Sequence, residues 1–223
     1  MEPKTKIRLF IACLILSIAL NFGVLGCSHA PDRFNPDYAR FRQTMHRFLL
    51  VPPEIGFYQE MPDGRMLWQA EGSRDAGVYI EQAVQDVMEA RALRVKSITA
   101  DNPGIKEMRE IRSLYRNVNR SIQLHIYGPQ VFATKQEVFD YSLGPIRQVL
   151  EKSGTDALVL VLGNQTNYKL GPETWLSIAI VAPDGRIAWY GMQAGREAVS
   201  LETSDKASEL VRRTLKTFLE GLS

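Results

Sequence analysis

The sequence contains very little cysteine or histidine. Its 223 residues include two cysteines and three histidines, the latter at His29, His46 and His125. No HExxH, CxxC, EF-hand or P-loop spacing is present. Metal centres need several His, Cys or carboxylate ligands at defined spacings, and disulfide frameworks need paired cysteines. We therefore expect no metal, no cofactor and no disulfide.

The sequence also lacks an apolar run long enough to cross a bilayer. Its one long run, Leu9 to Leu20, has about a dozen residues, whereas a spanning helix needs roughly 20. Lys4, Lys6 and Arg8 precede this run, and Asn21-Phe22-Gly23 follows it. A basic start, a short apolar core and a small-residue exit are typical of a secretory signal. A plain cleaved signal and an uncleaved membrane helix are the two simpler alternatives to a lipid-modified N-terminus.

The segment Val24-Leu25-Gly26-Cys27 resembles the lipobox of bacterial lipoproteins. The resemblance implies a signal peptide over 1–26, removed after Cys27 receives a diacylglyceryl thioether, and then a fatty acyl chain such as palmitate on the freed amine. Two chains suffice for stable anchoring, at roughly 0.8 kcal/mol per buried methylene. In that family the next residue directs sorting, and Ser28 implies the periplasmic face of the outer membrane. The inner membrane and the cell surface remain alternatives.

Removal of residues 1–26 changes the charge and the thiol content. The mature chain keeps 24 basic and 24 acidic residues, so its formal side-chain charge is zero. Nucleic-acid binding needs a concentrated basic face, so we expect no nucleic-acid partner. Because Cys13 leaves with the signal and Cys27 is acylated, the mature protein has no free thiol and must fold by burial alone.

The next stretch, residues 27–53, is interpreted as a tether that carries one short amphipathic helix. Asn35-Pro36 is a favourable helix start, and apolar residues recur at helical spacing from Tyr38 to Leu49. We expect this helix to pack against the domain, the alternative being contact with the membrane surface or a partner. Pro52-Pro53 ends it.

Residues 54–223 are expected to form a single periplasmic α/β domain. The patterns predict a hairpin around Pro62-Asp63-Gly64, a helix over 75–91, a strand over 93–99 and a helix ending near Gln123. Thr134 to Glu137 is a capping-box sequence, predicting a helix that is kinked at Gly144-Pro145 and ends at Lys152. The remaining expected elements are a buried strand over 157–162, a polar loop over 163–173, an antiparallel hairpin around Pro183-Asp184-Gly185, and a last helix over 204–222. This order predicts a mixed sheet with flanking helices.

The stretch Ser153 to Val161, followed by Ser177 to Val181 and Ile187-Ala188-Trp189, resembles lipoproteins related to the curli-assembly secretion factor and the penicillin-binding-protein activators. The resemblance covers roughly the last 70 residues and implies an anticodon-binding-domain-like fold. It departs at the first strand, where Val51 to Phe57 is only a loose match. The pore-forming hairpins of the curli factor are not evident, so channel activity is not implied.

Several residues are candidates for a binding surface, although each also has a purely structural explanation. His125 and Tyr127 precede a Gly-Pro break, where they line a cleft or form a buried hydrogen-bonded pair. Asn164, Asn167 and Tyr168 follow the carboxyl end of a buried strand, where α/β sheets bind ligands, unless this is a solvated loop. Aromatic residues of the last hairpin favour an interface or cross-strand packing, and these are Trp175 and Trp189.

Two functions compete. The first is a membrane-anchored, non-enzymatic envelope module that binds a periplasmic or outer-membrane protein in assembly or regulation. The second is an envelope hydrolase that uses Asp140 and Asp156 with His125. No Gly-x-Ser-x-Gly occurs, and Ser142 lacks the strand–turn–helix context of a nucleophile. We expect no catalytic residues, and the sequence favours the first function.

Overall fold

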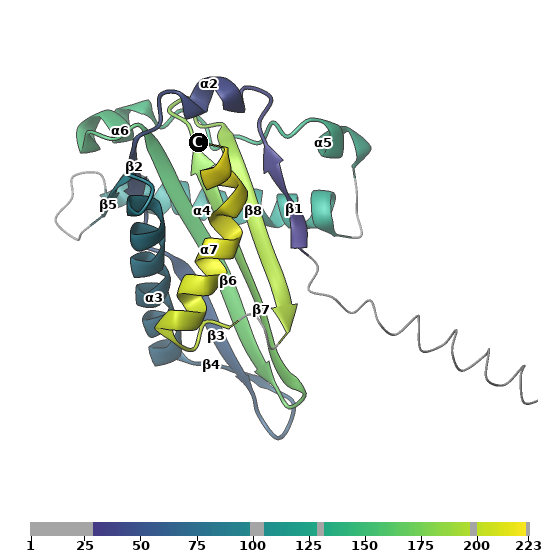
Figure 1. The fold of residues 1–223 in the computed structure, drawn as a ribbon. Coiled ribbons are helices and arrows are strands. Elements are labelled where there is room, and N and C mark those ends of the chain that lie inside the picture. Colours follow the sequence, from purple (N-terminus) through teal and green to yellow (C-terminus); the bar gives the residue numbers. More distant parts are fainter. Residues whose placement is uncertain (1–28, 99–104, 129–131, 197–199, 222–223) are drawn as a thin grey trace, which may run out of the picture.

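An eight-stranded mixed sheet organises the molecule (Figure 1). The computed structural model describes residues 29–98, 105–128, 132–196 and 200–221. The strand order is β1-β8-β7-β6-β2-β5, and β3 lies between β6 and β4. The strands are β1 (His29–Phe34), β2 (Arg47–Leu50), β3 (Glu54–Glu60), β4 (Met66–Trp68), β5 (Arg94–Ser97), β6 (Ala157–Tyr168), β7 (Gly171–Val181) and β8 (Ile187–Arg196). The predicted α/β class, mixed sheet and antiparallel hairpin are confirmed.

Strand β6 lies at the centre of this sheet. It pairs antiparallel with β7 on one side, and parallel with β2 and then β3 on the other, because those two strands follow one another along its length. The predicted buried strand over 157–162 is therefore correct, but the chain stays extended through Tyr168 where we expected a loop. The polar residue Gln165 is fully buried in this extension. Its side-chain oxygen accepts a hydrogen bond from the Leu201 backbone N–H at 2.6 Å, which offsets its desolvation.

Helices cover both faces of the sheet. One face carries α3 (Ala70–Glu89) and α7 (Ser204–Glu220), which lie in front of the strands in Figure 1. The other face carries α4 (Ile105–Ile122), the π-helix η2 (Gln123–Tyr127), and the short helices α5 (Ala133–Glu137) and α6 (Arg147–Ser153). Because successive side chains of a strand point to opposite faces, Val159 packs toward α3 and α7, and Leu158 packs toward α4. The core is therefore split into two layers by the sheet.

The segment that was interpreted as a tether belongs to this fold. Only Tyr38–Arg42 forms a helix, α2, whereas Arg47–Leu50 forms β2 between β5 and β6. Phe48 and Leu50 pack in the α3–α7 layer and Leu49 in the α4 layer, which is the two-residue alternation of a central strand. Phe41 near the end of α2 and Phe48 near the start of β2 are both buried, and with Met45 they recur at the spacing of a helix. This spacing led to the prediction of one helix.

The predicted kinked helix over 134–152 is also wrong. Helix α5 ends at Glu137, and residues 138–146 are irregular, with one isolated bridge at Ser142, until α6 begins at Arg147. This segment lies against the β7–β8 turn, where the Leu143 N–H donates to the Gly185 carbonyl at 2.8 Å. Gly185 has φ +86°, and a Cβ there would lie 1.7 Å from the Gly144 carbonyl oxygen. The close approach of the two backbones explains why this part of the chain is not helical.

Candidate functional site

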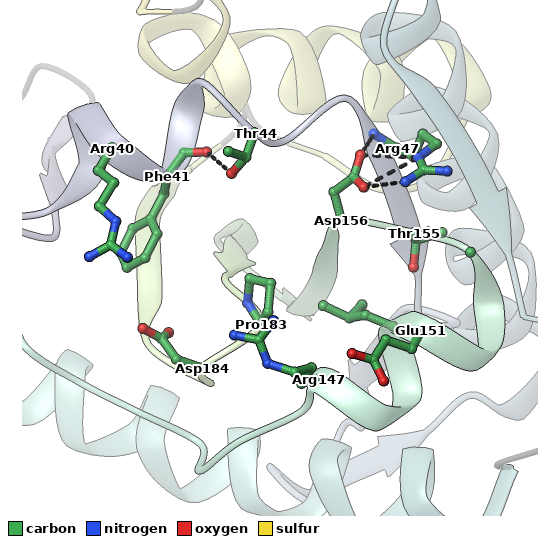
Figure 2. A pocket seen from close by; sticks show the side chains of 12 residues that line it. Arg40, Phe41, Thr44, Arg47, Arg147, Glu151, Thr155, Asp156, Pro183 and Asp184 are labelled. Carbon is green, nitrogen blue, oxygen red and sulfur yellow. Dashed lines mark hydrogen bonds and ion pairs between the residues drawn. The ribbon is translucent and has the colours of Figure 1, made fainter.

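A pocket of about 580 Å³ lies between α2, α6 and the β7–β8 turn (Figure 2). We call it the α2–α6 pocket. Its charged side chains are Arg40, Arg47, Arg147, Glu151, Asp156 and Asp184, so the two signs are balanced. Figure 2 shows the Arg47 guanidinium bound to the Asp156 carboxylate, and their closest atoms are 2.6 Å apart.

Asp156 acts as a structural joint in this pocket. Besides Arg47, its Oδ2 accepts hydrogen bonds from the backbone N–H groups of His46 at 3.2 Å and Arg47 at 2.9 Å. The hydrogen bonds from Arg47 hold the pKa of the Asp156 carboxyl below its usual range. These contacts join the start of β2 to the start of β6, and they occupy the carboxylate that the hydrolase hypothesis required.

A second cavity, of about 500 Å³, lies on the α4 face of the sheet. Three aromatic side chains line it, and we call it the aromatic cleft: Tyr58 of β3, Trp68 of β4 and Trp175 of β7. The strand register explains their grouping. Tyr58 lies opposite Trp68, and Asn164 lies opposite both Gly56 and Trp175. Since paired residues share a face, and residues two apart on a strand do as well, all five belong to one face.

Small residues keep the sheet side of the cleft open. A Cβ on Gly56 would lie 2.7 Å from the Asn164 side-chain oxygen and 2.8 Å from a Tyr58 ring carbon. Gly56 therefore allows Tyr58 and Asn164 to lie close together over the backbone of β3.

The other side of the cleft is formed by α4 and the first residue of η2. Arg116, Asn119, Arg120 and Gln123 follow one another at helical spacing and all line the cavity. Glu54 pairs with Arg116 at 3.3 Å and with Arg112 at 3.6 Å. Arg120 makes no ion pair with any residue that the structure describes. The cleft therefore has an excess of positive charge.

Two amide nitrogens of the cleft are unused. Asn119 is 3 % exposed, and its side-chain oxygen accepts hydrogen bonds from Ser177 Oγ at 2.9 Å and Tyr190 Oη at 2.8 Å. Within the described ranges its amide nitrogen donates to no partner. Gln123 Nε2 is buried and has no hydrogen-bond partner in the same part of the chain. Of these two nitrogens, Gln123 Nε2 alone is fully buried without a hydrogen bond, and the Gln123 side chain lies near enough to the Tyr190 phenol to lower the pKa of that group.

The structure brings Asn164 and Trp175 together in this cleft, and both were among the predicted surface residues. The other predicted strand residues lie elsewhere. Asn167 donates to Glu202 at 3.3 Å, and Tyr168 is exposed near the β6–β7 turn. Trp189 is fully buried in the α3–α7 layer, so it belongs to the core and not to a surface.

His125 and Tyr127 lie on η2, outside both cavities as described. The His125 ring contacts Phe132, with centroids 4.6 Å apart. The Tyr127 hydroxyl donates to the Pro31 carbonyl at 2.8 Å, and its ring stacks on Tyr190. Tyr127 therefore joins η2 to β1 and β8, and the His125 ring lies against the residue that precedes α5.

The three side chains of the hydrolase hypothesis are held by different partners. Asp140 pairs with Lys135 at 2.5 Å, Asp156 pairs with Arg47, and His125 packs on Phe132. Nothing places a base beside a nucleophile in this set, so the geometry does not support acid–base hydrolysis by these groups. In the described ranges, no group of three His, Cys, Asp or Glu residues is arranged to hold a metal ion.

The comparisons with known proteins give no family. No family model and no curated protein matches the sequence. Among solved structures, the chain is similar to the PelC dodecamer from Paraburkholderia phytofirmans, with 13% identity, a TM-score of 0.41, and coverage of 86% of this chain and 94% of that one. It is also similar to lipoprotein GNA1162 from Neisseria meningitidis, with 16% identity, a TM-score of 0.35, and coverage of 80% and 99%. The chain is also similar to the LpoB C-terminal domain from Salmonella enterica, with 11% identity, a TM-score of 0.31, and coverage of 73% of this chain and 94% of that one. At these scores the similarities carry no argument about function.

Proposed function

We propose that this protein is a lipid-anchored, non-catalytic module of the bacterial envelope, which binds a partner protein through the aromatic cleft. The anchor is Cys27, acylated after removal of residues 1–26. Ser28 after it favours the periplasmic face of the outer membrane. Among the described residues, no helix is both long and apolar enough to cross a bilayer.

The aromatic cleft is the observation that carries this proposal. Trp, Tyr and Arg dominate the energetics of protein interfaces, because they bury a large area and keep a polar group for specific contacts. The cleft combines Tyr58, Trp68 and Trp175 with Arg116 and Arg120. Trp68 is 58 % exposed beside Met66 at 46 % and Leu67 at 50 %, and a contiguous exposed apolar patch is typical of an interaction site.

Mass spectrometry of the mature N-terminus tests the anchor. We expect the N-terminal peptide to begin at Cys27 and to carry a diacylglyceryl group and an acyl chain. The Cys27→Ser variant should lose the lipid mass and leave the membrane fraction. An N-terminus at another residue, or an unmodified thiol at Cys27, would contradict the anchor.

Crosslinking in intact membranes tests the binding role. Purification of the crosslinked protein should yield a stoichiometric partner protein, and Trp68→Ala should reduce its recovery at least about tenfold, as expected for an interface anchor residue. Phe132→Ala is the matched control, because Phe132 is 54 % exposed but lies on the border of α5, outside the cleft. Equal recovery from the Trp68→Ala and Phe132→Ala variants would place the partner elsewhere.

A further inference from the structure

Exposed apolar side chains gather at one end of the sheet. The β3–β4 and β6–β7 turns both lie there, because β3 and β6 are parallel and end side by side. Figure 1 shows these two turns beyond the ends of α3 and α7. Leu170 lies in the β6–β7 turn and is 92 % exposed, and the other apolar residues of this end lie in the last two rows of the strands, at 37–50 % exposure. We call this group the hairpin-tip patch: Met66, Leu67, Tyr168 and Leu170.

The patch exposes both faces of the sheet at once. Successive residues of a strand point to opposite faces, so the side chains of Met66 and Leu67 lie on opposite sides of β4, and both are exposed. A partner protein that docks on a sheet covers one face, whereas a bilayer surrounds any end that enters it. Exposed apolar groups gathered in this way are typical of protein or membrane contact sites, and exposure on both faces favours the membrane.

The position of His29 places the proposed lipid anchor near the same end. Strand β1 is antiparallel to β8, and β8 ends beside the two turns, so β1 runs away from them. Its first residue, His29, lies in one row with Gly163 of β6. Tyr168 lies five residues further along β6 toward the turns, a distance of about 17 Å. Two residue steps from His29 allow Cys27 to lie at most about 7 Å in that direction. The patch therefore extends about 10 Å or more beyond the level that Cys27 can reach.

We propose that the hairpin-tip patch enters the bilayer in which Cys27 is anchored, as a second membrane contact beside the acyl chains. Protein segments at a membrane interface bury their apolar groups about 5–10 Å into the boundary between headgroups and acyl chains, which agrees with the extra reach of the patch. Tyr168, next to the turn, suits the headgroup level, where Tyr is enriched. The inference goes beyond the partner role but rests on the proposed acylation of Cys27, because it needs the protein at a membrane.

The charged groups of the two turns are balanced and already bonded. They are two acids and two bases: Glu60, Asp63, Arg65 and Lys169. Arg65 pairs with Asp63 at 2.7 Å. Lys169 joins the turns, because its backbone N–H donates to the Glu60 carboxylate at 2.9 Å and its Nζ donates to the Pro62 carbonyl at 3.1 Å. The two turns should therefore enter together, and since they have no net charge, anionic lipid is not required.

Spin labelling of the full-length lipidated protein in phosphatidylcholine vesicles tests the proposal. With Cys27 acylated the mature chain has no free thiol, so Met66→Cys gives a single position for a nitroxide. The depth of the nitroxide is measured from its relative accessibility to oxygen and to a water-soluble nickel complex. We expect the label at position 66 to lie about 5–10 Å inside the headgroup boundary.

Val138→Cys is the matched control, because Val138 and Met66 are both 46 % exposed. Val138 lies at the opposite end of the sheet. The carbonyl of the next residue, Phe139, accepts a hydrogen bond from the Asn35 side chain at 3.2 Å. The Asn35 backbone N–H in turn donates to Ala188 at the start of β8. The label at position 138 should therefore stay in water.

The Leu170→Asp variant should move the label at position 66 from the lipid into water, because a carboxylate at the tip is costly to bury. Leu170 is almost fully exposed, so this change leaves the folded domain intact. Val138→Asp should leave the label at position 66 in the lipid. A label at position 66 that lies in water without these changes overturns the proposal, as does a depth that Leu170→Asp does not alter. Insertion that appears only after phosphatidylglycerol is added also overturns it, since that result would show attraction by charge.

These results are separable from the failure of the proposed function. If Cys27 is acylated and the label at position 66 lies in water, the anchor holds and the tip contact fails. If the label enters the lipid while Trp68→Ala leaves recovery of the partner unchanged, the tip contact holds and the partner uses a surface other than the cleft. An unmodified Cys27, detected by mass spectrometry, overturns the anchor and this inference with it.

Discussion

The two faces of the sheet differ in how completely helices cover them. The α3–α7 face is dominated by large apolar side chains, and Phe48, Trp189 and Phe218 are each fully buried there. Their rings contact one another, with centroid distances of 6.1 Å for Phe48–Phe218 and 5.4 Å for Trp189–Phe218. This face is covered along the strands by two long helices, α3 and α7.

The α4 face buries polar groups among its apolar ones. Tyr115, Asn119, Ser177 and Tyr190 all lie inside, and burial raises the pKa of the Tyr115 phenol well above its usual range. One long helix covers this face, and it leaves the aromatic cleft open beside it. The α3–α7 side also buries polar groups, among them Gln165, Thr174 and Thr214, so polar burial does not separate the two faces. The open aromatic cleft does separate them, and we therefore assign stability chiefly to the α3–α7 layer and binding to the α4 layer.

The largest test of this comparison is Phe218→Ala. Truncation of a fully buried aromatic side chain in the α3–α7 layer should lower the free energy of unfolding by about 3–5 kcal/mol. Chemical denaturation measures this loss. The control Leu170→Ala, at a side chain that is 92 % exposed, should cost less than about 0.5 kcal/mol. A similarly small cost at Phe218 would contradict the assignment of stability to this layer.

An intermediate effect is expected from Asn119→Leu in the α4 layer. This change removes the acceptor for the Tyr190 hydroxyl and the shorter of the two contacts made by Ser177, and should cost about 2 kcal/mol. Adding Tyr190→Phe should recover part of that loss, because a hydroxyl without a partner is then removed as well. A double variant that is less stable than the sum of the two single changes would show that the polar groups are not coupled in this way.

The smallest effect is expected at the joint between β2 and β6, which belongs to neither layer alone. Asp156→Asn should cost about 1 kcal/mol at neutral pH, because the pair with Arg47 is partly exposed. The pKa of Asp156 is lowered in the folded state, so its contribution is present above the unfolded-state pKa and is lost as pH falls through the folded-state value. The stability difference between the two proteins should therefore begin to shrink near about pH 4, the unfolded-state value, and vanish only below the lower folded-state pKa. A difference that has not shrunk at pH 2 would exclude a charge-dependent contribution.

Much of this fold follows from local sequence patterns. The buried run over 157–162, the two Pro-Asp-Gly turns at residues 62 and 183, and the amphipathic helix that starts at Ser204 were all predicted correctly. Each is encoded within about 20 residues. The errors at 38–49 and 134–152 occur where tertiary contacts override local spacing, as when Leu143 bonds to the β7–β8 turn.

Only part of the site could be predicted from the sequence, because the rest depends on tertiary contacts. Asn164 was identified because it follows the apolar run of a buried strand, and Trp175 because it is an aromatic residue of the last predicted hairpin. The structure places the two directly opposite each other on β6 and β7. The residues from α4 were missed, since their approach to the hairpin depends on packing between distant parts of the chain. A signal did exist: Arg112, Arg116 and Arg120 recur every four residues and mark one face of that helix. The sequence alone did not show that the same face also presents two amides.

The early start of β1 has a consequence for where this protein can act. Its first residue, His29, lies in one row of the sheet with Gln193, Leu176 and Gly163, and Gly163 lines the aromatic cleft. Two residue steps separate Cys27 from His29, at most about 7 Å, and the row crosses about 15 Å to the cleft. A flexible tether over residues 27–53 would have allowed the cleft to lie up to about 90 Å from the lipid. If Cys27 is acylated as proposed, the cleft stays within about 25 Å of the lipid, and a partner that binds there would have to come to the membrane surface.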